Sequence, residues 1–168
     1  MSMSLTPARQ VVPWMVGALC AVTAAPTLAA ADCNVSATTL VFGAYDTLSN
    51  SESHISATLT VSCVIVIGTL ATVPYTISLS PSLTSGTMSR QMAGPMGSRL
   101  GYNLYTSAAR STVWGNGSGG TQTVANSVTP GSYGISAVQN HSVDGSLPVR
   151  QIVRPGSYSD GIVVTVDY

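Results

Sequence analysis

Few side chains in this sequence could perform catalysis. The only two histidines, His54 and His141, belong to neither an H-x-x-x-H nor an H-E-x-x-H pattern, which are the spacings that bind zinc on a helix. We expect both at a loop or a strand end. No carboxylate pair is set within an apolar strand, and no G-x-S-x-G nucleophile elbow is present. The sequence therefore indicates a protein that is not an enzyme and that carries no metal or small-molecule cofactor.

One glycine-rich stretch has the spacing of a dinucleotide-binding loop. "GNGSGG" at residues 115–120 matches G-x-G-x-x-G. However, the stretch follows no apolar strand, opens no helix and lacks the acidic residue expected about 20 positions later. It is predicted to be a flexible loop.

The first 31 residues have the three parts of a secretory signal peptide. Arg9 provides a basic charge, residues 11–28 form an almost uncharged apolar run, and residues 29–31 are three alanines typical of a cleavage site. A membrane anchor is the alternative, but Pro13 and Pro26 interrupt the apolar run and no basic cluster follows it. We predict that residues 1–31 are cleaved, so that the chain is secreted.

Residues 32–168 remain after this cleavage, and 137 residues suit a single domain with one core. This part has five arginines, no lysine and six acidic residues, giving a net charge near −1. Five cationic side chains could neutralise only a small number of phosphate groups, which argues against nucleic-acid binding.

Two cysteines, Cys33 and Cys63, lie in the predicted mature chain. Export takes them to an oxidising compartment, so a disulfide between them is expected. The bond would remove roughly 3.5 to 4 kcal/mol of conformational freedom from the unfolded chain. A metal-binding or nucleophilic pair is the alternative, but no histidine or second cysteine pair lies nearby in sequence.

Apolar residues recur at every second position, which is typical of half-buried β-strands. The clearest cases are "HISATLTVSC" at residues 54–63 and "VPYTISLS" at residues 73–80. Weaker cases lie at residues 35–42, 100–105, 133–138 and 162–168. Turn-forming clusters such as "TPGS", "VDGSLP" and "RPGS" separate them. Short strands spaced in this way predict an all-β sandwich.

The last strand has an apolar face without an obvious partner. Ile162, Val164, Val166 and Tyr168 alternate with Val163, Thr165 and Asp167 up to the final residue. An unpaired strand with an apolar flank is prone to aggregate unless another chain covers it. We therefore predict a docking edge at Ile162, Val164, Val166 and Tyr168, with Leu59, Val61 or Ile77 below it.

Several motifs, in order, resemble the spore coat U domain family, whose members include the pilins of archaic chaperone-usher fimbriae. They are "CNV" at 33–35, "FGAY" at 42–45, "TVSC" at 60–63, "SRQM" at 89–92, "LGYNLYTSAARSTVWGNG" at 100–117 and "GSYSDGIVVTVDY" at 156–168. The resemblance covers nearly all of residues 33–168.

The resemblance implies an incomplete immunoglobulin-like β-sandwich that lacks its last strand. A periplasmic chaperone would fill the apolar groove first, and the N-terminal extension of a neighbouring pilus subunit would replace it after passage through an outer-membrane usher. The implied protein is a structural or adhesive fimbrial subunit at the cell surface, involved in attachment and biofilm formation. The alternative is a secreted spore-coat or surface-layer protein that associates with itself without an usher.

Two features depart from this family. Fibre-forming members usually carry a donor extension before the first cysteine, whereas the predicted mature chain starts at Asp32, immediately before Cys33. This favours a tip or initiating subunit that accepts a strand and donates none. The second feature is the apolar stretch "VIVIGTLATV" at 64–73. Either the preceding strand continues through it, or Ile65, Val66 and Ile67 form an exposed loop that contacts other surfaces.

Overall fold

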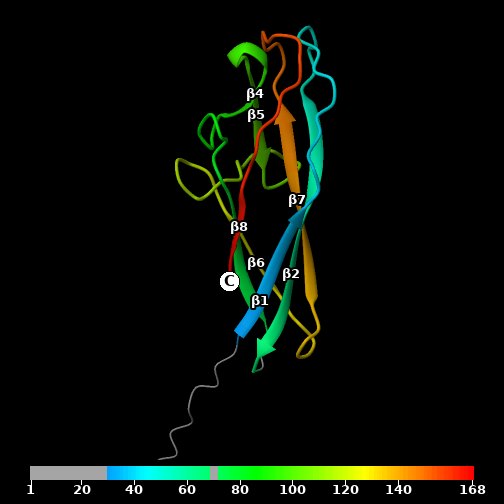
Figure 1. Cartoon of the computed structure of the whole chain (residues 1–168), viewed down its shortest axis with the longest axis vertical. Helices are drawn as coiled ribbons and strands as arrows, with labels where there is room; N and C mark the ends of the chain where they lie inside the picture. Colours follow the sequence, from blue (N-terminus) through cyan, green and yellow to red (C-terminus); the bar gives the residue numbers. More distant parts are fainter. Residues whose placement is uncertain (1–29, 69–71) are drawn as a thin grey trace, which may run out of the picture.

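The computed structural model describes residues 30–68 and 72–168, which form eight β-strands and one short 3₁₀ helix (Figure 1). The strands are β1 (Ala30–Ala37), β2 (Ser53–Ile67), β3 (Val73–Leu79), β4 (Arg90–Ala93), β5 (Arg99–Tyr105), β6 (Val124–Val128), β7 (Ala137–Leu147) and β8 (Val164–Asp167). The 3₁₀ helix η1 (Pro95–Gly97) joins β4 to β5. The predicted signal peptide lies outside the described residues, apart from Ala30 and Ala31.

The strands form two sheets, and every pair of neighbouring strands is antiparallel. The larger sheet has the order β1-β2-β7-β5-β4, and the smaller has the order β6-β3-β8. The inner faces of both sheets contribute to one core of mostly aliphatic side chains. The predicted all-β sandwich of the immunoglobulin-like type is confirmed.

The alternation in β2 and β3 places the core as the sequence predicts. In β2, Leu59, Val61 and Cys63 are fully buried, while every second residue between them is more exposed. In β3, all four predicted inward residues are buried: Val73, Tyr75, Ile77 and Leu79. Ile55 is the exception to this alternation. It lies near the start of β2, and its side chain is partly exposed rather than buried.

The β7 strand is the largest difference from the sequence prediction. Only Ala137 and Val138 of the predicted strand at 133–138 belong to it, and the strand continues through the predicted turn "VDGSLP" to Leu147. β7 is the central strand of its sheet, where ladders to β2 and β5 on both sides override the weak strand propensity of Asp144 and Gly145. The strands β4 and β6 were not predicted.

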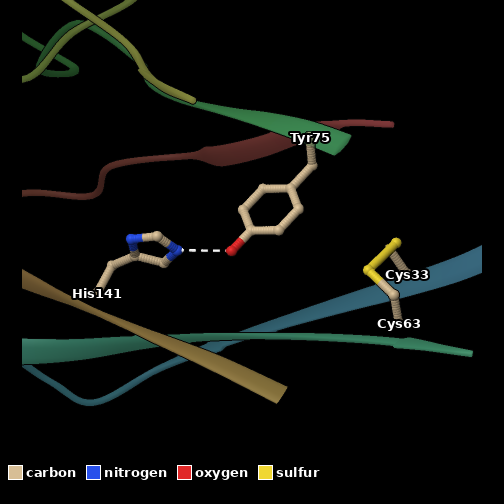
Figure 2. The surroundings of a disulfide bond; sticks show 4 residues. All are labelled: Cys33, Cys63, Tyr75 and His141. Atoms are coloured by element: carbon tan, nitrogen blue, oxygen red, sulfur yellow. Dashed lines mark hydrogen bonds between the residues drawn. A yellow bond between two sulfur atoms is a disulfide. The ribbon is translucent and has the colours of Figure 1, made fainter. Parts of the chain in front are cut away.

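The Cys33–Cys63 disulfide joins β1 to β2 (Figure 2). The two residues lie directly opposite each other in the antiparallel ladder. The bond therefore attaches the edge strand β1 to the one strand that pairs with it among the described residues, in addition to restricting the unfolded chain. The predicted disulfide is confirmed.

A polar contact crosses the core between the two sheets near this disulfide (Figure 2). The Tyr75 hydroxyl of β3 and the His141 Nε2 of β7 share a hydrogen bond of 2.8 Å. The His141 ring also packs edge-on against Trp114. Burial lowers the pKa of His141. His54 lies at the start of β2, as expected, but the prediction for His141 was wrong because this residue lies inside β7.

The free energy of unfolding is expected to fall at acidic pH because of His141. Its lowered pKa in the folded state means that the unfolded chain binds the proton more tightly. Stability should be constant above about pH 7.5, decrease as the pH falls through about 6.5 and level off below the lowered pKa. Urea unfolding between about pH 8 and pH 5.5 measures this.

His141→Gln should remove most of this pH dependence. His54→Gln is the matched control, because the His54 side chain is exposed, and it should retain the wild-type profile. If His141→Gln kept the wild-type dependence of stability on pH, His141 would not be the cause of that dependence.

Candidate functional site

An apolar groove of about 1030 Å³ opens between the two sheets. Its floor consists of inward side chains from five strands, and most of them are buried. These floor residues are Ala57, Leu59, Leu79, Met92, Leu100, Tyr102, Leu104, Val143 and Leu147. Two chain segments form the walls: residues 37–47, which follow β1, and residues 153–164, which lead into β8.

The first wall is fixed at its two ends by side-chain hydrogen bonds. At one end, Thr38 Oγ1 accepts a hydrogen bond of 2.9 Å from the Thr58 backbone N–H. At the other, the Tyr45 hydroxyl donates to the Pro148 carbonyl at 2.9 Å and accepts from the Gln151 N–H at 2.7 Å. Within the described chain, the backbone of residues 39–44 forms no hydrogen bond with another protein group. This stretch leaves an unpaired edge beside the groove.

The second wall is tied to the floor through Asp160. One carboxylate oxygen, Oδ2, accepts a hydrogen bond of 2.7 Å from the Tyr102 hydroxyl of β5. The other, Oδ1, accepts from the backbone N–H groups of Leu83 at 3.2 Å and Gly161 at 2.9 Å. Burial, together with this hydrogen bond, raises the pKa of Tyr102. The chain is thus held in place immediately before it enters β8.

The β8 strand pairs on one side only. Its ladder to β3 joins Leu79 to Val164 and Ile77 to Val166. No other strand among the described residues pairs with β8, so its second edge carries free backbone N–H and C=O groups along the groove.

The sequence-predicted edge residues divide into two groups. Ile162 and Val164 line the groove. Val166 is half-buried against the core but does not line the groove, and Tyr168 is 58% exposed.

The predicted floor was partly correct. Leu59 lines the groove, whereas Val61 and Ile77 are core residues outside it. Sequence reasoning missed Leu100 and Leu104, although both occupy the inward positions of the "LGYNLY" alternation. It also assigned residues 35–42 to a strand, whereas β1 ends at Ala37 and the residues that follow form the first wall.

Ile65, Val66 and Ile67 form the end of β2 rather than a loop, so the strand continues as far as Ile67. A role of these residues in contact with other surfaces stays a prediction. Ile65 is buried and accepts a hydrogen bond from the Gly134 N–H, whereas Val66 and Ile67 are exposed. The strand continues because β1 pairs with it as far as Ile67.

A fully buried arginine supports the site from the β4 side. Arg90 donates hydrogen bonds of 2.9 to 3.1 Å to three backbone carbonyls, those of Ser80, Thr87 and Trp114, and to the Asn103 side chain. Burial lowers its pKa. These bonds join the end of β3 to β4 and to the segment around Trp114.

Within 30–68 and 72–168, no group of three or more His, Cys, Asp or Glu is placed to hold a metal ion. The same residues contain no helix of the length and apolarity needed to cross a membrane.

The sequence profile described as the Spore Coat Protein U domain matches residues 18–165, most of the chain. The chain belongs to the Spore Coat Protein U domain family. The comparison with curated proteins finds no match.

Among solved structures, this Spore Coat Protein U domain is similar to a chain from the CsuC-CsuE chaperone-tip adhesion subunit pre-assembly complex of archaic chaperone-usher Csu pili of Acinetobacter baumannii. The TM-score is 0.55 at 18% sequence identity, and the match covers 83% of this chain and 40% of the other. This likeness concerns the fold, and the domain spans less than half the length of that chain.

Tyr102→Phe should destabilise the protein by loosening the second wall. The substitution removes the hydroxyl that donates to Asp160, and a hydrogen bond to a charged group contributes about 1.5 to 3 kcal/mol. Urea unfolding should show a loss of this size. Tyr105→Phe is the matched control, since the Tyr105 hydroxyl forms no hydrogen bond with the described residues. Equal losses of unfolding free energy in both variants would contradict the role of Asp160.

Proposed function

We propose that this protein is a structural, non-enzymatic subunit of a surface fimbria and that its groove accepts a β-strand from another chain. The observation that carries the proposal is the apolar groove, which is flanked by two backbone edges without partners. A strand placed between these edges would satisfy backbone groups on both sides. Its alternate side chains would cover the aliphatic floor, which is the physical basis of binding by strand addition.

The groove suits a strand better than a small ligand. Its lining includes few charged side chains, those of Asp46, Arg154 and Asp160, and Asp160 is already engaged by three donors. A small polar ligand would need several convergent polar groups on the floor, whereas the floor is almost wholly aliphatic. Main-chain pairing along the two edges needs no such groups.

The partners in this proposal are a periplasmic chaperone, an outer-membrane usher and neighbouring pilus subunits. The family and the likeness to a chain of a chaperone-tip adhesion subunit complex support this choice. The protein would pass through the periplasm and act in the fimbrium at the cell surface, in attachment and biofilm formation.

A position at the tip of the fimbria is part of the proposal. Cleavage before Asp32 would start the mature chain inside β1, because β1 begins at Ala30. No residues would then precede β1 to serve as a donor strand. A subunit that accepts a strand but donates none can occupy only the end of the fibre where nothing needs its strand.

A photo-crosslinking residue in place of Met92 should attach to a partner chain during export. Met92 lines the groove and is only half-buried, so a longer side chain is tolerated there. In cells that produce a matching chaperone and usher, adducts with the chaperone and then with a pilus subunit are expected on gel electrophoresis.

Val138 is the matched control for this experiment, because it is exposed on β7 and does not line the groove. The same crosslinking residue there should give few or no adducts. Equal adducts at both positions, or none at position 92 in protein whose cysteines are oxidised, would contradict strand acceptance.

The alternative proposal is a spore-coat or surface-layer protein that associates with itself without an usher, and the family description favours it. In that case the adduct at position 92 would contain a second copy of this chain and would form without a chaperone.

Amino-terminal sequencing of the secreted protein tests the tip position. We expect the mature chain to begin at Asp32, because the alanines before it form the predicted cleavage site. A donor strand needs roughly the length of an ordinary strand. A mature start about ten residues or more before Cys33 would rule out the tip assignment.

A further inference from the structure

Gly145 occupies an unusual place, inside the central strand β7 of the larger sheet, where it pairs with Ile55 of β2 and Leu104 of β5. Glycine weakens a strand interior, so its presence there usually marks a close approach of another group. Its backbone is not in the left-handed region that favours glycine. A Cβ at this position would instead lie 2.8 Å from Phe42 Cζ and 3.1 Å from both Leu40 Cδ atoms. Space, rather than backbone conformation, therefore requires glycine here.

The two side chains that use this space come from the first wall of the groove. Leu40 and Phe42 are half-buried against the core, and the Phe42 ring packs edge-on against Tyr102 at a centroid distance of 6.1 Å. They lie in the stretch 39–44, whose backbone has no hydrogen-bonded partner. Between its anchors at Thr38 and Tyr45, this stretch is held against the sheet by side-chain packing and not by a ladder.

We infer that Gly145 is a positioning residue for the strand-binding groove. By leaving room for Leu40 and Phe42, it holds residues 39–44 as a second pairing edge, so that an incoming strand of another chain forms hydrogen bonds both to this edge and to β8. The inference rests on the proposed function, and it adds that the edge at residues 39–44 depends on glycine at position 145.

Gly145→Ala should selectively disable this edge. The added Cβ must displace Phe42 and Leu40, whereas β8 is held by β3 and by Ser80 on the far side of the groove. The probe is a synthetic peptide of about nine residues that alternates valine and threonine, the length of a long strand. Binding should weaken about tenfold, a factor within the usual effect of overpacking.

Hydrogen exchange separates this role from a general loss of stability. In the wild-type protein, the peptide should protect the amides of residues 39–44 and those of Val164 and Val166 on the free edge of β8. In Gly145→Ala it should protect only Val164 and Val166. Gly145→Ala with Phe42→Leu, which removes Cζ, should recover part of the protection at 39–44.

Gly131→Ala is the matched control, because a Cβ there would contact nothing within 4 Å and the backbone is not left-handed. It should behave as wild type. Equal protection of residues 39–44 in wild type and Gly145→Ala would overturn the inference and leave the proposed function intact. Phe42→Ala removes the ring that packs in the space beside Gly145. If Phe42→Ala bound the peptide more tightly than the wild type, the inference would also be overturned. No peptide binding by the wild-type protein would overturn both.

Discussion

Among the described residues, the backbone of β8 is paired on one side only, and the walls of the groove are arranged around this edge. Free N–H and C=O groups beside an apolar floor attract any strand of suitable pattern, so an exposed edge of this kind invites aggregation. Covering it with a further strand of the same chain would remove the risk and also the site. The sequence instead leaves the edge free and fixes the segments around it.

The fixed segments are held mainly by side-chain to backbone hydrogen bonds. Arg90 and Tyr45 each bind two main-chain groups at least ten residues away in sequence, and Asp160 binds the Leu83 N–H and the Tyr102 hydroxyl. The disulfide likewise fixes β1, which pairs with one strand among the described residues. A small number of such contacts gives the walls definite positions where a sheet ladder is absent.

Sequence patterns predicted the strands that have one face against the core and the other in solvent. In β2, β3 and β8, one face meets the core and the other meets solvent, so the alternation is regular and the inward residues can be read directly. The end of β7 was predicted as a turn because "VDGSLP" contains Asp144 and Gly145, whose presence in a strand depends on the two neighbouring strands β2 and β5. Arg90 was part of a motif, but its partners Ser80 and Trp114 lie far from it in sequence. Contacts of that kind leave no local signal.

The two edges of the groove differ in how they are held, and this difference bears on function. β8 belongs to a ladder with β3, so its geometry is fixed by regular hydrogen bonds. Residues 39–44 are held by packing of Leu40 and Phe42 and by anchors at each end. The position of the first wall therefore depends on the packing of two side chains, whereas that of β8 depends on a ladder. Under the proposed function, an incoming strand would meet one edge that is already in strand geometry and a second edge whose position is set by side chains.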